Sequence, residues 1–287
     1  MKTHRPLLTV IAVAVRAIGI LGPALLLGHA ARAQTILGTT GGYAVMSGGT
    51  VTNNGVTTLN GNLGVNGTAG SGSYTFTTGS QFTTTVQNQT DFTKAFNGLA
   101  AMPGAVDLSG KILGTTAGAT TLTPGIYKFT STAQLTGTLI LDAQHQSNAV
   151  WVFQIGSTLT TAASSAVTFT NLAANAVVND GLFWQVGTTT TFGTNTAFEG
   201  NVLGGTTFSF ASGATINDGR ALSGTGAITL AGNNINFIGA NSGYSGGLAF
   251  DGGGNVVSAI PEPATNALIA ACAALGLALY RRRRAAS

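Results

Sequence analysis

The sequence predicts an all-β fold, a β-solenoid, and three observations lead to this prediction. Many short strand-like runs, separated by Gly, Asn or Ala-Ser, fill residues 34–240. Segments of the second half repeat with a period near 20 residues. Only one segment has apolar residues at the spacing of an α-helix. A β-sandwich is the alternative, because its strand spacing is compatible, but it does not predict that the repeats align in register.

The first 33 residues have the three parts of a secretory signal peptide. "MKTHR" supplies positive charge, an apolar run extends from Leu7 to Leu27, and "ARA" at Ala31–Ala33 fits a small-residue cleavage site. We therefore expect residues 1–33 to be removed. An uncleaved anchor is the alternative, because the apolar run is close to the ~20 residues that a membrane-spanning helix needs.

The segment 86–101, "VQNQTDFTKAFNGLAA", is typical of an α-helix. Four apolar residues recur at helical spacing and form one stripe: Phe92, Ala95, Phe96 and Leu99. Pro103 ends the helix, because proline cannot continue a helical hydrogen-bond pattern. We expect the stripe to pack against a β-sheet.

The repeat in the second half joins two short strands through a corner of small residues. Its four copies are "TLTTAASSAVTF" (158–169), "TTTFGTNTAFEG" (189–200), "TFSFASGATIND" (207–218) and "AITLAGNNINF" (227–237). Equivalent residues are separated by steps of 31, 18 and 20, and they are Thr161, Phe192, Phe210 and Leu230. The longest step contains the loop 171–181, without which the period is near 20. Such a period suits a solenoid whose turns stack about 4.8 Å apart.

Threonine recurs at outward positions of the first strand of each copy. Side chains of a strand alternate between its faces, so placing the apolar residues inside fixes which residues point outward. The inward residues are then Leu159, Thr161, Thr190, Phe192, Phe208, Phe210, Ile228 and Leu230. The outward residues, which stack into two files, are Thr158, Thr160, Thr189, Thr191, Thr207, Ser209, Ala227 and Thr229. Further candidates for these files are Thr50, Thr52, Thr75 and Thr77.

These files differ from an ordinary protein surface in what they lack. No Lys or Glu stands among them, and the β-branched Thr side chain is stiff at χ1. The backbone fixes alternate residues of a strand about 6.7 Å apart, so the files form a flat, half-apolar lattice that can order first-shell water. Ordered water matches ice, and we hypothesise that ice is the partner. Thr also favours strands in general, so a purely structural coating is the alternative.

Charge and motif content exclude several other functions. Charged residues make up 7% of the 287-residue chain, and residues 34–260 hold four basic and seven acidic side chains, a net charge of −3. This acidic body excludes nucleic acid as an expected partner, despite the overall charge of +4. No nucleophile elbow, phosphate loop or paired His/Cys cluster occurs, so we expect no enzyme, metal or other cofactor. Trp151 and Trp184 lie in strongly apolar strands and are expected in the core.

The C-terminus has the parts of a bacterial sorting signal. After a linker expected to be flexible, residues 241–259, the motif Pro261-Glu262-Pro263 precedes the apolar stretch Ala264–Tyr280 and four arginines, Arg281–Arg284. Residues 260–287 therefore resemble the PEP-CTERM signal of Gram-negative bacteria. The resemblance implies processing by a membrane protease of the exosortase type and export, with the protein secreted or placed in the outer cell envelope.

The apolar stretch of this signal is at the short edge of a transmembrane helix. It would give the chain its only membrane contact, before processing, and an ordinary tail anchor is the alternative. The single cysteine, Cys272, lies within it, so no disulfide can stabilise the body.

Several segments of the body resemble the microbial ice-binding proteins of the discontinuous β-solenoid type. They are "TLNGNLGV" (58–65), "LTPGIYKF" (122–129), "AQLTGTLILDAQ" (133–144), "NAVWVFQIGSTLTTA" (148–162), "FWQVG" (183–187) and "GRALSGTGAITL" (219–230). The resemblance covers about 35–240 in the order of the family. It implies a right-handed solenoid of roughly triangular section with one long helix packed alongside, here 86–101.

The resemblance also implies adsorption to ice through one broad, flat face, without metal or cofactor. The ice face varies in sequence within the family, so the Thr files are a hypothesis about which face is used. Glu199 is bulky and acidic and disfavours the neighbouring face. A different class of function is the alternative, a structural or adhesive envelope or biofilm-matrix protein that binds exopolysaccharide.

Overall fold

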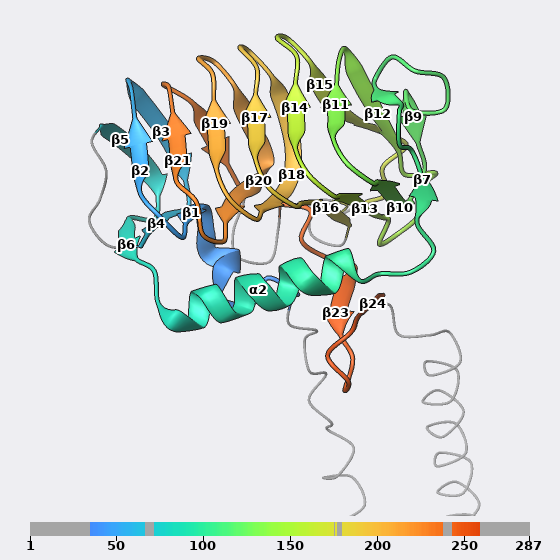
Figure 1. Ribbon diagram of the computed structural model, residues 1–287, viewed down its shortest axis with the longest axis horizontal. Coiled ribbons are helices and arrows are strands. Elements are labelled where there is room, and N and C mark those ends of the chain that lie inside the picture. The colour runs from blue at the N-terminus through green and yellow to red at the C-terminus, as the bar shows by residue number, and fades with distance from the viewer. Residues whose placement is uncertain (1–34, 67–71, 175, 177–179, 238–242, 259–287) are drawn as a thin grey trace, which may run out of the picture. The chain divides into compact units, whose positions relative to one another are not determined.

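The computed structural model describes residues 35–66, 72–174, 176, 180–237 and 243–258. The predicted signal peptide (1–33) and sorting signal (260–287) lie outside the described residues. Within them, short parallel strands stack side by side, and one long helix, α2 (Val86–Ala100), runs along the stack (Figure 1). This confirms a mostly β fold with parallel sheets and one helix. The β-sandwich alternative is wrong, because sandwich sheets are antiparallel.

Two parallel sheets and one short hairpin contain all the described strands. The smaller sheet has, in order across it, β2 (Val51–Asn53), β21 (Ile228–Leu230), β19 (Phe208–Phe210), β17 (Thr190–Phe192), β14 (Leu159–Thr161), β11 (Ala133–Leu135) and β8 (Ile112–Leu113). The main path of the larger sheet is β5 (Ser73–Thr78), β3 (Val56–Asn60), β22 (Asn234–Asn236), β20 (Thr215–Ser223), β18 (Ala197–Gly204), β16 (Gly181–Val186), β13 (Val150–Ile155), β10 (Gly125–Phe129) and β7 (Val106–Asp107). Beside this path lie β1 (Tyr43–Ser47), β4 (Asn62–Val65), β6 (Gln81–Thr83), β9 (Thr121–Leu122), β12 (Thr138–Asp142) and β15 (Ala166–Thr170).

The larger sheet turns a corner inside its two longest strands. The start of β18 pairs with β15, whereas its second half pairs with β16, and the register against β20 shifts between Glu199 and Asn201. Gly200 stands at this corner with φ of +90°, and a Cβ there would lie 2.4 Å from Leu182 Cγ. Only glycine meets both demands at low cost.

The corner gives the stack three faces. The threonine face is the outward side of the smaller sheet. The helix face consists of β6, β4, β1, the second halves of β20 and β18, and β16, β13, β10 and β7. The third face consists of β5, β3, β22, the first halves of β20 and β18, and β15, β12 and β9.

The coils do not stack in chain order. The early strands β1, β2 and β3 pair with the late strands β20, β21 and β22. Helix α2 follows β6 at one end of the larger sheet and precedes β7 at the other (Figure 1). Its 15 residues span about 22 Å, or between four and five strand spacings. The chain therefore crosses to the far end along α2 and coils back until its last coil meets its first, a discontinuous solenoid.

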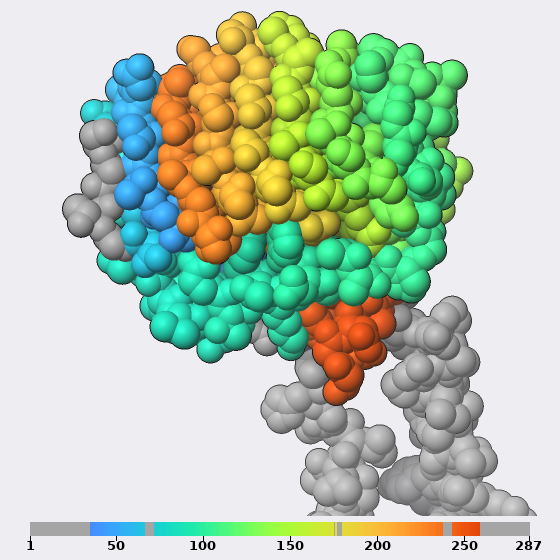
Figure 2. Space-filling view, viewed as in Figure 1, coloured from blue at the N-terminus to red at the C-terminus, as the bar shows by residue number. Residues whose placement is uncertain are grey.

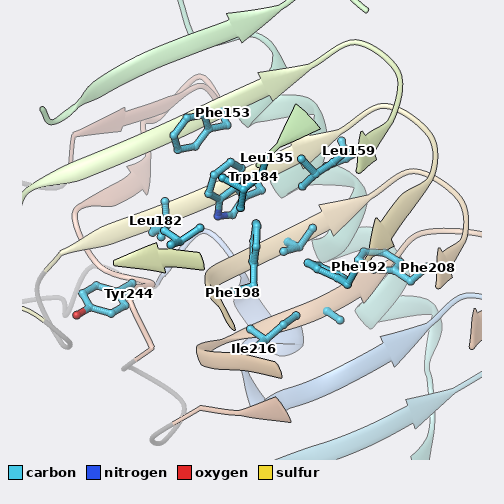
Figure 3. Close-up of a cluster of buried hydrophobic side chains, with 14 of the residues drawn as sticks. Leu135, Phe153, Leu159, Leu182, Trp184, Phe192, Phe198, Phe208, Ile216 and Tyr244 are labelled. Atoms are coloured by element: carbon cyan, nitrogen blue, oxygen red, sulfur yellow. The ribbon is translucent and has the colours of Figure 1, made fainter. Parts of the chain in front are cut away.

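The core fills the space inside the coils. The rings of Phe153 and Trp184 stack with centroids 3.9 Å apart, and Phe192 and Phe198 meet edge to face nearby (Figure 3). Trp151 and Trp184 are fully buried, and their indole N–H groups donate to the carbonyls of Leu122 (3.1 Å) and Glu199 (3.0 Å). The prediction that both tryptophans belong to the core is confirmed.

Helix α2 forms where its sequence predicts it. Thr85 caps its first turn, with its hydroxyl accepting from the Asn88 N–H in a capping box. The predicted stripe faces the sheet, with Phe92, Ala95 and Leu99 buried against Val152, Phe183, Leu203 and Leu222, and with Phe96 partly buried there. Gln154 donates through Nε2 to the carbonyls of Leu99 and Met102, both at 2.8 Å, and so satisfies acceptors at the helix end. The helix covers one face of the solenoid.

Part of the segment expected to be a flexible linker is ordered. In 241–259 the structure contains an antiparallel hairpin, β23 (Leu248–Phe250) paired with β24 (Val256–Ser258). Leu248 and Val256 are buried in the cluster beneath α2, and Asp251 accepts from the Asn255 N–H in the turn. The linker prediction is therefore wrong for this stretch, because packing of Leu248 and Val256 beneath α2 supports a hairpin that composition does not predict. Among the described residues, no helix combines the length and apolar character that crossing a membrane requires.

Candidate functional site

The middle residues of the smaller sheet form one outward file. Register pairs Thr160 with Thr191, Thr191 with Ser209, and Ser209 with Thr229. Gln134 and Thr52 extend this file beyond Thr160 and Thr229, and Ile112 ends it on β8. All of these side chains are exposed or half-exposed. The predicted residues Thr160, Thr191, Ser209 and Thr229 thus lie side by side, one strand apart.

A second file lies two residues earlier in each strand. The amides of Ala133, Leu159 and Thr190 donate to the carbonyls of Thr158, Thr189 and Thr207 at 2.8 to 3.0 Å. The same pattern adds Ala227 and Thr50, whose carbonyls accept from Phe208 and Ile228. The hydroxyls of Thr189 and Thr207 lie 3.1 Å apart, within hydrogen-bond distance. The other three predicted residues, Thr158, Thr189 and Thr207, therefore also share one file.

The structure thus brings all seven predicted positions together on the threonine face. Thr50 and Thr52 lie in the same files. Thr75 lies on the third face, where it pairs with Thr58, and Thr77 also belongs to that strand, β5. Placing them in the Thr files was wrong, because the alternation of a strand does not tell which face of a coil the strand occupies. Sequence reasoning missed Gln134, although its surroundings, "STAQL" (131–135), parallel "STLTT" (157–161) one coil later.

The inward positions beneath the files are filled as predicted. Leu159, Phe192, Phe208, Phe210, Ile228 and Leu230 are all buried. Thr161 and Thr190 also point inward and are buried. The Thr161 hydroxyl lies 2.8 Å from that of Thr196 and accepts from the Gly193 N–H, whereas the Thr190 hydroxyl has no hydrogen-bond partner. Buried apolar side chains, three of them phenylalanines, therefore support the wall from inside.

Small residues border the files. Two positions after the middle file stand Ala162, Gly193, Ala211 and Ala231. The two files and this border together contain no charged residue over β2, β21, β19, β17, β14 and β11. Figure 2 looks onto this side of the molecule, where successive coils appear as parallel bands of colour. The face is an even array of hydroxyl and methyl groups.

This array can order water but carries no catalytic group. Neighbouring residues of one file are one strand spacing apart, about 4.8 Å, and the two files are about 6.7 Å apart. Stiff β-branched side chains on a packed wall lose little further entropy when they hold water in place. Hydroxyl groups that can bind water thus stand beside methyl groups that cannot.

The third face is less regular. Its outward positions include Ile140, Asp142 and Glu199. Burial raises the pKa of the Glu199 carboxyl to about 8, and the nearby Asp218 carboxylate adds to the rise. Asn60 Nδ2 donates to Asn236 Oδ1 at 2.6 Å, so the polar groups on this face partly satisfy each other.

Other polar residues serve local structure. Asp142 accepts from the Gln144 N–H and from Asn171 Nδ2, which holds a turn and lowers the pKa of Asp142. His145 is exposed in that turn. Within the described ranges, no group of three or more His, Cys, Asp and Glu side chains is placed to hold a metal ion.

Comparison with known proteins identifies the family. The model of the Ice-binding-like family matches residues 45–236, which is more than half of the chain. The chain belongs to the Ice-binding-like family. The matched stretch begins in β1, ends in β22 and contains the whole threonine face from β2 onward.

The chain is also similar to individual proteins that are named as ice-binding. An ice-binding protein of Nostoc sp. (strain HG1) is 46% identical over 149 residues, which are 52% of this chain and 52% of that protein. Among solved structures, an ice-binding protein from the Antarctic ascomycete Antarctomyces psychrotrophicus superposes with a TM-score of 0.63 at 32% identity, over 72% of this chain and 99% of that one. One from an Antarctic biological consortium gives a TM-score of 0.62 at 36% identity, over 70% and 90%. The curated relatives are matched over 16% to 52% of their own length.

Proposed function

We propose that this protein binds ice through the threonine face. The observation that carries the proposal is the in-register, charge-free array of Thr160, Thr191, Ser209 and Thr229 beside Thr158, Thr189 and Thr207. Membership in the Ice-binding-like family supports it, and the named relatives are ice-binding proteins. Adsorbed protein would inhibit ice growth and recrystallisation near the cell.

Adsorption needs no chemistry beyond ordered water. Because the wall is rigid, the water held between the Thr files keeps its spacing, and a growing ice front incorporates it without further ordering of the side chains. The helix face is covered by α2, which leaves the threonine face as the broad uniform surface. We therefore infer a binding protein rather than an enzyme, and no cofactor.

We infer two further properties from the sequence. The N-terminal signal and the arrangement of Pro261, Glu262 and Pro263 before an apolar stretch and an arginine cluster support export from a Gram-negative cell and an exosortase-type protease as processing partner. Right-handed coiling is favoured because crossovers between parallel strands of one sheet are nearly always right-handed.

Binding of exopolysaccharide is the competing function. Sugar sites favour exposed aromatic side chains, and both tryptophans are fully buried, so neither can stack on a sugar. The structure gives this alternative no specific support.

Ice-affinity purification tests the proposal. We expect the protein to enter slowly grown ice and Thr160→Tyr, which raises a ring above the lattice, to be largely excluded. The control Thr138→Tyr places the same ring on the third face and should enter ice like the wild type. Exclusion of the wild-type protein from ice refutes ice binding. If Thr160→Tyr enters ice as well as the wild-type protein does, ice binding belongs to another face.

A further inference from the structure

The strand edges at one end of the stack are unpaired. Among the described strands, β5 pairs only with β3, and β6 pairs only with β4. Each therefore presents backbone N–H and C=O groups along its outer edge. Almost every residue of β5 and β6 is exposed or half-exposed. Such an edge is a template for another strand.

The two ends of the stack differ in how their edges are protected. The sequence from residue 35 to residue 85, in which β5 and β6 lie, contains no charged residue and no proline. At the opposite end, β7, β8 and β9 are only two residues long each, and Asp107, Lys111 and Pro124 stand in or next to them. Natural proteins protect edges with short strands, charges and proline. Neither a charge nor a proline stands in β5 or β6, and β5 is six residues long, although its register against β3 shifts between Leu59 and Asn60.

The core also reaches the surface at the β5 and β6 end. Tyr74 and Phe76 point inward from β5, yet they are only partly buried against the core, with ring centroids 6.4 Å apart. Gln81 and Thr83 are in register with the buried Leu63 and Val65 but are exposed. Phe82, between them, points to the opposite side of the strand and is 48% exposed. The inward positions of β5 and β6 therefore lack the covering that a further coil would give.

We propose that a second copy of this chain covers this end, by pairing of β5 with β5 of the copy. Two uncharged ends can meet without burying a charge. The opposite end carries Asp107 and Lys111, so docking it here would cost the desolvation free energy of those charges. Antiparallel pairing of two identical edges about a twofold axis uses the free edge of β5 in both copies. The assembly therefore stops at a dimer and does not extend into a fibre. The contact buries the outer sides of Tyr74 and Phe76. It involves no residue of the threonine face and does not depend on ice binding.

Sedimentation velocity tests the proposal on the full chain, in detergent so that its apolar ends do not associate. We expect a dimer at high concentration that dissociates on dilution. Thr75→Lys adds a charge to the edge without touching the core and should raise the dimer dissociation constant at least ~10-fold. The matched control, Thr58→Lys, places the same charge on the paired inner strand β3 and should leave dimerisation unchanged.

Hydrogen exchange gives a second readout that does not depend on a variant. Backbone amides of β5 should be protected more strongly at high than at low protein concentration. A monomer at every concentration overturns the proposal. So does a dimer that Thr75→Lys leaves intact, or one that Thr58→Lys weakens as strongly.

Discussion

The threonine face and the third face are made by the same coils, yet only the first is regular. The strands of the threonine face are straight and two or three residues long, and each presents the same two outward positions. On the third face β18 and β20 bend at the corner, and their outward residues include Glu199. Regular stacking of the backbone is therefore not sufficient for a regular array of side chains. The outward residues of successive coils must also be alike.

The polar groups of the two faces also have different partners. On the third face Thr78 donates to Asn60 and Asn60 donates to Asn236, so the side chains form a ladder with one another. On the threonine face, the hydroxyls of Thr160, Thr191 and Thr229 have no hydrogen-bond partner among the described residues, whereas those of Thr189 and Thr207 lie 3.1 Å apart. The middle file of the threonine face therefore keeps its hydroxyls available to solvent, whereas the polar side chains of the third face partly satisfy one another.

The largest effect is expected from bulk placed on the threonine face. Thr189→Tyr combined with Thr191→Tyr should reduce recrystallisation inhibition more than ~10-fold, as loss of a central contact residue does at other interfaces. Thr168→Tyr, on the third face, should have no effect. Circular dichroism and melting confirm that both variants fold. Equal loss in both would remove the distinction between the faces.

A smaller effect is expected from pH, and it should act on stability alone. The pKa of Glu199 is raised in the folded protein to about 8, so the folded state holds its proton where the unfolded state has lost it. Stability is then full below the unfolded pKa, near 4.5, and falls as pH rises towards 8, by on the order of 1.4 kcal/mol per pH unit. Asp180 and Asp218, whose pKa values are also raised, act in the same direction.

Urea unfolding between pH 5 and 9 measures this dependence. Glu199→Gln should flatten it, while ice recrystallisation inhibition by the folded wild-type protein should stay constant over the same range, because no titratable group lies on the threonine face. An inhibition that follows the titration of Glu199 would place the third face in contact with ice.

A gain in stability is expected from removing the orphan hydroxyl beneath the threonine face. Thr190→Val replaces a buried, unpartnered hydroxyl with a methyl group of similar shape. Because an unsatisfied buried polar group costs about 1–3 kcal/mol, the variant should unfold at higher urea concentration. Ice activity should be unchanged. A loss of stability would show that this hydroxyl has a partner.

The smallest effect is expected from filling a gap. Ala227 stands between Thr207 and Thr50 in the second file and lacks a hydroxyl. Ala227→Thr should raise thermal hysteresis by a factor of about two or less, as one added water contact is worth well under 1 kcal/mol net. Ala197→Thr on the third face is the control. Equal gains from both variants would mean that position on a face does not matter.

The fold and the files were predictable because they rest on local periodicities. Alternation within a strand placed Leu159 and Phe192 inside and Thr160 and Thr191 outside, and helical spacing placed α2 within one residue of its observed end. That the coils stack out of chain order was predicted from the family resemblance alone. The pairing of β2 with β21 joins residues almost 180 positions apart, which no local pattern specifies.

Two features could not be predicted for physical reasons. The segment around Thr75 has the same alternation of polar and apolar residues as the strands that carry the Thr files. The face that Thr75 occupies depends on which side of the coil its strand forms. The hairpin of β23 and β24 is only three residues on each side, and its order comes from packing of Leu248 and Val256 beneath α2 rather than from its own propensity.

Because the last coil lies against the first, the protein cannot be lengthened by adding residues at either terminus of the described body. An extra turn must enter inside the chain, for example between β7 and β20, and the connection that contains α2 must then lengthen with it. Each added turn raises the stack by about 4.8 Å, the length of about three helical residues. A wider threonine face is thus coupled to a longer connection along the helix face of the molecule.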